Sequence, residues 1–332
     1  MEALLGLTLE QIGQICLKEG LPRFAAGQIA QWLYRHRVRS IEQMTNLSKA
    51  ARERLSAAYE VGVTEPSDVI CSADGTKKYL FGSVEAVMIP DQERATLCVS
   101  SQKGCKMACK FCMTGRGGFH GQLSVAEIIS QYVATEEAER LTNTVFMGMG
   151  EPMDNWENVK QAIEVLTAPW GFGWSPKRIT LSTIGAHVER FLDEGGCHLA
   201  VSLHNPFPEE RLQIMPMEKA WPIRQTVETI RRYDWSGQRR VSFEYTLCEG
   251  INDSRRHADG LISLLRGLEC RVNLIRCHRI PDSPYGPPSQ EVIGTFERRL
   301  NDAGIRATLR ASRGEDILAA CGMLAGKKGE KI

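Results

Sequence analysis

The features that the 332-residue chain lacks exclude several classes of protein. No segment approaches the roughly 18 consecutive apolar residues of a membrane-spanning helix, so we expect no integral membrane protein. The opening residues, MEALLGLTLEQ, have neither a basic region nor a long apolar run, so we expect no secretory signal peptide. No internal repeat or low-complexity segment is present. The composition, 42% hydrophobic and 24% charged, indicates a globular chain with a sizeable core.

The cysteines also lack the pattern of a secreted protein, because the eleven of them are an odd number without a regular disulfide spacing. Such a set indicates a reducing compartment. We therefore expect the cytoplasm, where thiols persist and metal clusters can be loaded.

A net charge of only +1 argues against a uniformly basic nucleic-acid-binding protein, but the positive charge is unevenly distributed. Residues 18–54 contain eight basic and three acidic residues, and residues 94–120 contain five basic residues and no acidic one. Such basic stretches fit contacts with phosphate groups. The alternatives are a solvated helix face for the first stretch and neutralisation of cysteine thiolates for the second.

Three cysteines, Cys105, Cys109 and Cys112, form a Cys-x3-Cys-x2-Cys run in GCKMACKFCMTG. Thiolates this close together can hold three irons of a [4Fe–4S] cluster, which normally takes four cysteines. The fourth iron would then be open to a small molecule that binds there and receives an electron. This spacing resembles that of radical S-adenosylmethionine (SAM) enzymes, whose open iron is chelated by the amino and carboxyl groups of SAM. The alternatives are a zinc site completed by His120 or a distant ligand, and a redox cluster of cysteines.

Hydrophobic spacing divides the chain into four parts. We expect a helical domain over residues 1–62, a small antiparallel β extension over 63–101, a core over 102–326 and a polar tail over 327–332. In the core, helix patterns alternate with six strand patterns, which predicts parallel strands joined by right-handed crossovers. The six are NTVFMGMG, RITLST, HLAVSLH, RRVSFEYTL, CRVNLIR and IRATLRAS. A partial (β/α)6 barrel and a doubly wound sheet both fit this alternation, and in either the chemistry lies at the carboxyl ends of the strands.

Three successive strand ends carry glycine or polar residues. Gly148, Gly150 and Glu151 follow the first core strand, Ser182 ends the second, and the stretch 202–204 (Ser-Leu-His) ends the third. Glycines there let a ligand approach the backbone, whose polar groups can bind the ammonium of a zwitterion. Each signal alone fits an ordinary turn glycine or a structural histidine, but the three together favour a binding site.

Several segments, in their order along the chain, resemble the RlmN/Cfr family of radical SAM RNA methyltransferases. The matching segments are GCKMACKFCMTG, VFMGMGEPMDN, ITLSTIG, VSLHNP, EGINDS, VNLI and RGEDILAACGMLAG, and the match runs from about residue 5 to residue 326. The resemblance implies a partial (β/α)6 barrel behind an N-terminal helical domain that contacts RNA. It also implies a monomer that takes electrons from a donor such as flavodoxin.

The resemblance assigns roles residue by residue. Cys105, Cys109 and Cys112 would bind the [4Fe–4S] cluster. Cys321 in AACGML matches the cysteine that carries the methyl group, Cys98 in TLCVSS its resolving partner, and Glu85 in VEAVMIP a proton acceptor. From the residues alone, both cysteines could be small buried hydrophobes and Glu85 an exposed strand residue. The implied SAM contacts are Gly150, Glu151, Ser182, Ser202, Leu203, His204 and His278.

One position departs from the family pattern. His278 in VNLIRCHRI stands where the family usually has asparagine. An imidazole donates or accepts a hydrogen bond at each nitrogen, but it does not reproduce both functions of an amide in one geometry. We keep His278 as a candidate SAM contact.

The resemblance also implies a mechanism that uses two SAM molecules per turnover. One methylates Cys321, and reductive cleavage of the second gives a 5′-deoxyadenosyl radical that takes a hydrogen from the S-methyl group. The carbon radical adds to adenine, and Cys98 then releases the product by forming a transient disulfide with Cys321. We expect methylation of adenosine C2 in the peptidyl-transferase region of 23S rRNA and in tRNA next to the anticodon, because GEP after the first core strand resembles the RlmN branch.

Two alternatives remain open from the sequence. The first is methylation of adenine C8 in 23S rRNA, as in the Cfr branch, which would confer antibiotic resistance. The second is a non-catalytic iron–sulfur protein that binds RNA.

Overall fold

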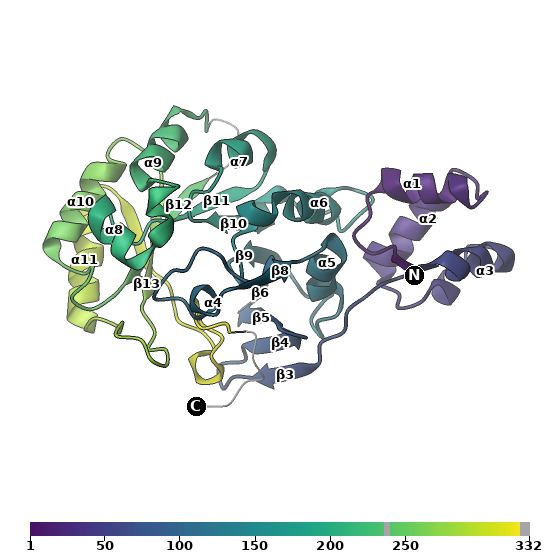
Figure 1. The fold of residues 1–332 in the computed structure, drawn as a ribbon, viewed down its shortest axis with the longest axis horizontal. Helices are drawn as coiled ribbons and strands as arrows, with labels where there is room; N and C mark the ends of the chain where they lie inside the picture. Colours follow the sequence, from purple (N-terminus) through teal and green to yellow (C-terminus); the bar gives the residue numbers. More distant parts are fainter. Residues whose placement is uncertain (236–239, 326–332) are drawn as a thin grey trace.

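A computed structural model describes residues 1–235 and 240–325, which form a ten-stranded sheet, helices around it and a helical unit at one end (Figure 1). The predicted polar tail over 327–332 lies outside the described residues. Within the described residues, no helix combines the length and the apolar character that a membrane crossing requires. The strands of the large sheet are β3 (Asp68–Cys71), β4 (Lys77–Phe81), β5 (Val84–Asp91), β6 (Arg94–Cys98), β9 (Asn143–Phe146), β10 (Ile179–Thr183), β11 (His198–Ser202), β12 (Val241–Leu247), β13 (Arg271–Arg276) and β14 (Arg306–Leu309).

The parallel part of this sheet follows the chain order without reversal, from β9 through β10, β11, β12 and β13 to β14. A doubly wound sheet would reverse its direction at a switch point. Right-handed crossovers that always advance in one direction place their helices on one face of the sheet, which is the arrangement of a partial barrel. The predicted partial barrel is therefore confirmed. The helices between its strands are α5 (Val125–Val133), α6 (Trp156–Thr167), α7 (Val188–Glu194), α8 (Pro208–Ile214), α9 (Ile223–Arg232), α10 (Arg255–Leu265) and α11 (Gln290–Asp302).

The antiparallel extension is continuous with the barrel. Strands β3 to β6 pair antiparallel in chain order, but the other edge of β6 pairs parallel with β9, where Cys98 lies opposite Val145. Strand β6 thus belongs to both parts, and it adds a seventh parallel strand to the six expected from the sequence. The residues of β6 do not predict this pairing. One edge of the strand pairs antiparallel with β5 and the other pairs parallel with β9, and the same strand pattern fits both.

The first 60 residues form a helical unit, as expected, with three α-helices, α1 (Leu9–Lys18), α2 (Ala25–Gln31) and α3 (Lys49–Ala58). The side chain of Ser48 accepts a hydrogen bond from the amide of Ala51 and so caps the start of α3. Two short strands, β1 (Glu2–Ala3) and β2 (Tyr59–Glu60), pair in parallel and close this unit. The unit lies beside α5 and α6 at one end of the barrel (Figure 1).

Part of the basic stretch 18–54 holds this unit to the barrel. The guanidinium of Arg35 donates to the carbonyls of Phe172 at 2.7 Å and Pro169 at 3.1 Å. Arg39 donates to the carbonyl of Val133 at 2.8 Å. These two arginines are therefore committed to intramolecular contacts, which the charge count alone could not distinguish from phosphate binding.

Replacing Arg35 with alanine should loosen the helical unit. The variant loses two hydrogen bonds from a charged donor, and we expect the free energy of unfolding to fall by about 1–2 kcal/mol. Urea denaturation measures the change. The matched control is Arg23→Ala, an exposed arginine of the same stretch, whose effect should stay within about 0.5 kcal/mol. Equal effects of the two substitutions would contradict the structural role of Arg35.

Candidate active site

The carboxyl ends of the seven parallel strands meet at one edge, and each strand supplies residues to two adjoining cavities there. In strand order from β6 to β14, examples are Cys98, Phe146, Ser182, Ser202, Thr246, Ile275 and Arg310, of which Arg310 directly follows its strand. Because parallel strands all end at the same edge, residues far apart in the sequence become neighbours.

The three predicted cluster ligands lie on a loop, residues 105–118, between two short antiparallel strands, β7 (Gln102–Gly104) and β8 (Phe119–Gln122). The loop closes tightly, because the amide of Cys105 donates to the carbonyl of Gly118 at 2.8 Å. A Cβ atom on Gly104 would lie 1.9 Å from the same carbonyl oxygen, so only glycine fits there.

Three basic residues of the stretch 94–120 fix this loop in place. Lys103 pairs with Glu127 at 2.8 Å and Lys106 with Asp154 at 2.9 Å. Arg116 donates to two backbone carbonyls of the segment that follows β13, at 2.7 and 3.0 Å. These cations therefore stabilise the conformation of the loop, a role that the charge count did not predict.

The three thiols, those of Cys105, Cys109 and Cys112, line one cavity. Within residues 1–235 and 240–325, no three His, Cys, Asp or Glu side chains are close enough to bind a single metal ion. A cluster places each cysteine on a different iron, so its ligands need not converge on one point. His120, the candidate fourth zinc ligand, instead has Nε2 3.0 Å from the carbonyl of Gly117. The arrangement therefore fits a [4Fe–4S] cluster better than a zinc site.

The cavity that these thiols line has a volume of about 150 Å³, and six of the seven predicted SAM contacts line it as well. These six residues are Gly150, Glu151, Ser182, Ser202, His204 and His278. The ring of Phe111, between two of the cysteines, lies edge-on to the ring of His204 with 4.9 Å between centroids, and both rings line the cavity.

Glu151 is a buried carboxyl group in the wall of this cavity. It accepts hydrogen bonds from the amides of Met153 at 3.1 Å and Ile184 at 3.0 Å. Burial raises the pKa of Glu151 to about 7 in spite of these donors. An ammonium group placed beside it would favour the charged carboxylate, which suits the amino end of SAM.

His204 is neutral and held in one orientation. Its Nδ1 accepts a hydrogen bond from the amide of Thr246 at 2.9 Å, which joins the ends of β11 and β12. Burial, and then the nearby charge of Arg211, lower the pKa of His204 to about 3. With Nδ1 accepting, the proton lies on Nε2, where it is available as a donor.

A second cavity, also about 150 Å³, adjoins the first and is lined by Cys98 and Cys321. Cys98 is buried and Cys321 is exposed. The structure thus brings together the two cysteines that the resemblance pairs, beside the cluster loop. Both cavities are lined by Cys112, Met147, Gly148, Ile275, His278, Cys321 and Gly322.

Arg310 supplies positive charge to this second cavity. Its Nη1 donates to a carboxylate oxygen of the buried Glu244 at 3.4 Å. Burial, and then the neighbouring Cys321, raise the pKa of Cys98 to about 12, whereas Arg310 lowers it. The guanidinium therefore favours the thiolate at a position that burial otherwise keeps protonated.

Two predicted site residues line neither cavity. Glu85 is buried on β5 in an ion pair with Lys78 at 3.0 Å, so it is not the exposed strand residue that its pattern also allowed. The side chain of Leu203 is fully buried, and its carbonyl accepts a hydrogen bond from Nε of Arg211 at 2.9 Å. The roles that the resemblance gives Glu85 and Leu203 stay predictions.

Sequence reasoning missed several residues of the two cavities. Thr246 lies at the end of the fourth core strand and Arg310 at the end of the last one. A search for polar residues at strand ends, as made for the first three core strands, would have found both. Cys277 lines the first cavity, and Ser312 and Arg313 line the second. No local signal distinguishes these three, because the fold of the segments after β13 and β14 brings them in.

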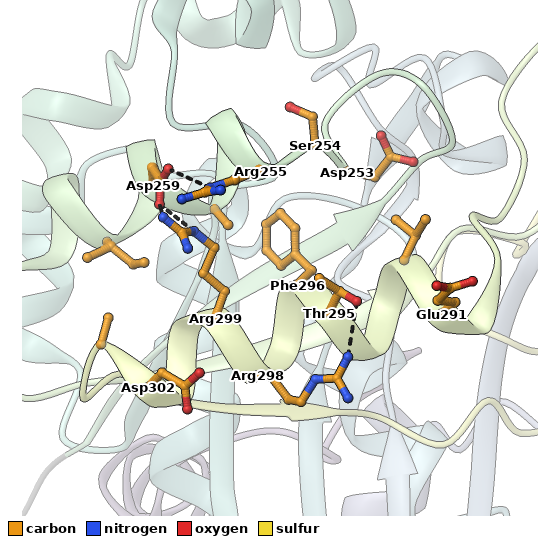
Figure 2. A pocket seen from close by; sticks show the side chains of 14 residues that line it. Asp253, Ser254, Arg255, Asp259, Glu291, Thr295, Phe296, Arg298, Arg299 and Asp302 are labelled. Carbon is orange, nitrogen blue, oxygen red and sulfur yellow. Dashed lines mark hydrogen bonds and ion pairs between the residues drawn. The ribbon is translucent and has the colours of Figure 1, made fainter.

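A larger groove, about 870 Å³, lies on the outer surface between α10 and α11 (Figure 2). Three of its charged side chains pair with one another, since Asp259 accepts from Arg299 at 2.5 Å and lies 3.9 Å from Arg255. None of the predicted site residues lines it. The smaller cavities at the strand ends, and not this groove, are therefore the candidate active site.

Comparisons with known proteins show the family to which the chain belongs. Residues 99–259 match the Radical SAM superfamily, and residues 3–61 match the ribosomal RNA large subunit methyltransferase N-terminal domain. The chain is 56% identical to the probable dual-specificity RNA methyltransferase RlmN of Porphyromonas gingivalis, over 98% of each protein. It is 39% identical to the dual-specificity RNA methyltransferase RlmN of Syntrophus aciditrophicus, over 97% of this chain and 95% of that protein.

A solved structure is similar over nearly the whole chain. The crystal structure of a radical SAM methyltransferase from Sphaerobacter thermophilus superposes with a TM-score of 0.93 at 39% sequence identity. The superposition covers 98% of this chain and 100% of that one, so both the barrel and the helical unit are shared.

The neutral state of His204 predicts a pH dependence of stability. Its folded pKa of about 3 lies below the ordinary 6.5, so its contribution is present above pH 6.5 and is lost as the pH falls toward 3. His204→Asn keeps an acceptor for the amide of Thr246 but cannot titrate. Below pH 6.5 the wild type should lose up to about 1.4 kcal/mol per pH unit more unfolding free energy than the variant.

Urea denaturation of both proteins at about pH 7.5, 6 and 5 measures this difference. The difference in unfolding free energy between wild type and variant should shrink as the pH falls. Parallel pH profiles would contradict a buried, neutral His204.

Proposed function

Because the chain belongs to the RlmN family of radical SAM RNA methyltransferases, we propose that it methylates C2 of adenosine in 23S rRNA and in tRNA next to the anticodon. The observation that carries the proposal is the shared cavity of Cys98 and Cys321, which adjoins the cavity of the cluster loop. A plain SAM-binding fold has no use for such a pair of thiols. A methyl carrier and its resolving partner need this arrangement.

The residues of the first cavity would hold both cofactors. Cys105, Cys109 and Cys112 would bind the [4Fe–4S] cluster, while Glu151 and His204 would hold SAM beside it. When bound, the cluster and SAM supply radical chemistry, which this substrate needs because C2 of adenine is not nucleophilic. The protein contributes orientation and shielding, and the ring of Phe111 is placed to exclude water.

The two cysteines of the second cavity would act in sequence. Cys321, which is exposed and lines the cavity, would receive a methyl group that SAM supplies and would carry that group to adenine. Release would then require that the Sγ atoms of Cys98 and Cys321 bond while the bond between Cys321 and the transferred carbon breaks. The electron pair of the broken bond stays with that carbon, which takes up a proton to complete the methyl group. Arg310 supports this step by favouring the Cys98 thiolate. Glu85 stays our candidate proton acceptor, although it lies outside the two cavities.

The RNA must present an unstacked adenosine to this pocket, as other enzymes that modify bases require. RNA is recognised largely by shape and by phosphate and 2′-hydroxyl contacts, for which the N-terminal helical unit is our candidate surface. We further propose that the protein acts as a cytoplasmic monomer and that a flavodoxin-type donor reduces the cluster.

Isotope labelling tests both the radical route and the position of the methyl group. The reconstituted enzyme is given trideuteromethyl-SAM, a reductant and unmodified rRNA or tRNA under anaerobic conditions, and the nucleosides are analysed by mass spectrometry. We expect 2-methyladenosine with two deuterium atoms in its methyl group, because one is removed as the S-methyl group is activated. Product at C8 would move the protein to the Cfr-type reaction, and three retained deuterium atoms would contradict the radical route.

Cys321→Ala is the matched control for the labelling experiment. It should abolish product formation and leave RNA affinity and cluster content close to those of the wild type. Product from this variant would contradict the methyl-carrying role of Cys321. Absence of product from the wild type, with cluster and RNA bound, would favour the non-catalytic RNA-binding alternative.

A further inference from the structure

The segment that carries Cys321 has little regular structure of its own. Between the end of β14 and residue 325 its only helical turn, among the described residues, is a short 3-10 turn over Glu315–Ile317. Leu318 directly follows this turn with φ at 53°, a left-handed conformation that is strained for a bulky residue. Such strain persists only where the surroundings fix the backbone. Contacts with the rest of the protein must therefore hold the segment in place.

The antiparallel extension provides many of these contacts. The turn between β3 and β4 binds the start of the segment, because Asp74 accepts from the amide of Gly314 at 3.0 Å. Asp316 in turn accepts from the hydroxyl of Ser72 at 2.5 Å and from the amide of Ala73 at 3.2 Å. The extension thus supports the start of the Cys321 segment.

A further contact of the extension with this segment is a buried ion pair between two of its strands. Nζ of Lys78 on β4 lies 3.0 Å from Oε1 of Glu85 on β5, and the two side chains are 4% and 2% exposed. Lys78 also donates to the carbonyl of Leu318 at 3.5 Å. Glu85 accepts from the amide of Ala325 at 2.7 Å. The pair therefore binds the backbone of the segment before Cys321, at Leu318, and after it, at Ala325.

A buried ion pair alone adds little to stability, because the free-energy cost of removing two charges from water offsets most of their mutual attraction. A well-packed apolar pair would hold β4 and β5 together equally well. An apolar pair could not, however, bond the carbonyl of Leu318 and the amide of Ala325. These two hydrogen bonds to the backbone of the Cys321 segment explain why the pair is polar.

We propose that Lys78 and Glu85 are positioning residues that seat the Cys321 segment opposite Cys98. The cation fixes the strained backbone before Cys321, and the carboxylate fixes the backbone after it. The consequence for methyl transfer rests on the proposed function, whereas the seat itself does not. Lys78 lines neither cavity and has no role in the chemistry proposed above.

Hydrogen exchange of the peptide that contains residues 314–325, read by mass spectrometry without SAM or RNA, tests the seat. Lys78→Met should accelerate its exchange about tenfold, because the segment opens locally more often. Lys77→Met is the matched control: Lys77 precedes it on β4, but its amine pairs with Glu136 and Glu137 instead. The control should leave exchange in this segment unchanged.

A double variant separates seating from overall stability. Lys78→Met leaves Glu85 buried without its cation and could destabilise the whole fold, so we add Lys78→Met/Glu85→Leu, which removes both charges. Its melting temperature should return close to that of the wild type, while exchange in the segment stays fast because the acceptor for Ala325 is gone. Unchanged exchange in the double variant would overturn the proposal, as would acceleration spread evenly over the whole chain.

Transfer of a methyl group from SAM to Cys321, measured as a mass increase of the Cys321 peptide, gives the functional readout. This transfer should slow about tenfold in Lys78→Met relative to Lys77→Met, with equal cluster content. Equal rates in the two variants would overturn the positioning role. If neither the wild type nor any variant methylates RNA, the proposed function fails, but the exchange experiment still decides whether Lys78 and Glu85 hold the segment.

Discussion

The candidate site depends on the parallel pairing of β6 with β9. Without it, Cys98 would belong to a separate antiparallel sheet, and only six strands would meet at the carboxyl edge. With it, Cys98 lies opposite Val145 and faces the same edge as the residues after β9 to β14. The pairing also places the antiparallel extension beside residues 314–325, the segment that contains Cys321. One stretch of backbone hydrogen bonds therefore determines where Cys98 lies and what supports the segment that contains Cys321.

Polar groups in this site are costly to bury, and most of them are paired. Arg211, fully buried, bonds to Glu218 and to the carbonyls of Leu203 and Ser202 near the end of β11. His204 is kept neutral and Glu151 is held by backbone amides, so neither leaves an uncompensated charge. These bonds fix the loops at the strand ends before any ligand binds. Preorganisation of this kind is what a radical reaction needs, because the reacting groups must meet while water is excluded.

Much of the architecture could be predicted from the sequence, because alternating strand and helix patterns have few solutions once crossovers are right-handed. The cluster loop was predictable from its spacing, and three strand ends from their polar residues. The pairing of β6 was not, since the same strand pattern fits either neighbour direction. Cys98 and Cys321 came only from the resemblance, because a thiol that carries a methyl group has the same local pattern as one buried in a core. Glu85 was placed by resemblance too, and its partner Lys78 had no signal.

The most direct test is to look for the covalent intermediate that Cys98 is proposed to resolve. Cys98→Ala is incubated with SAM, reductant and substrate RNA, then digested and analysed by mass spectrometry for a nucleotide attached to the protein. The account predicts an adenosine-containing adduct on the Cys321 peptide, present in the variant and absent from wild type after turnover. Methylated RNA released by the variant without an adduct, or an adduct on another residue, would contradict the pairing of the two cysteines on which this interpretation of the site depends.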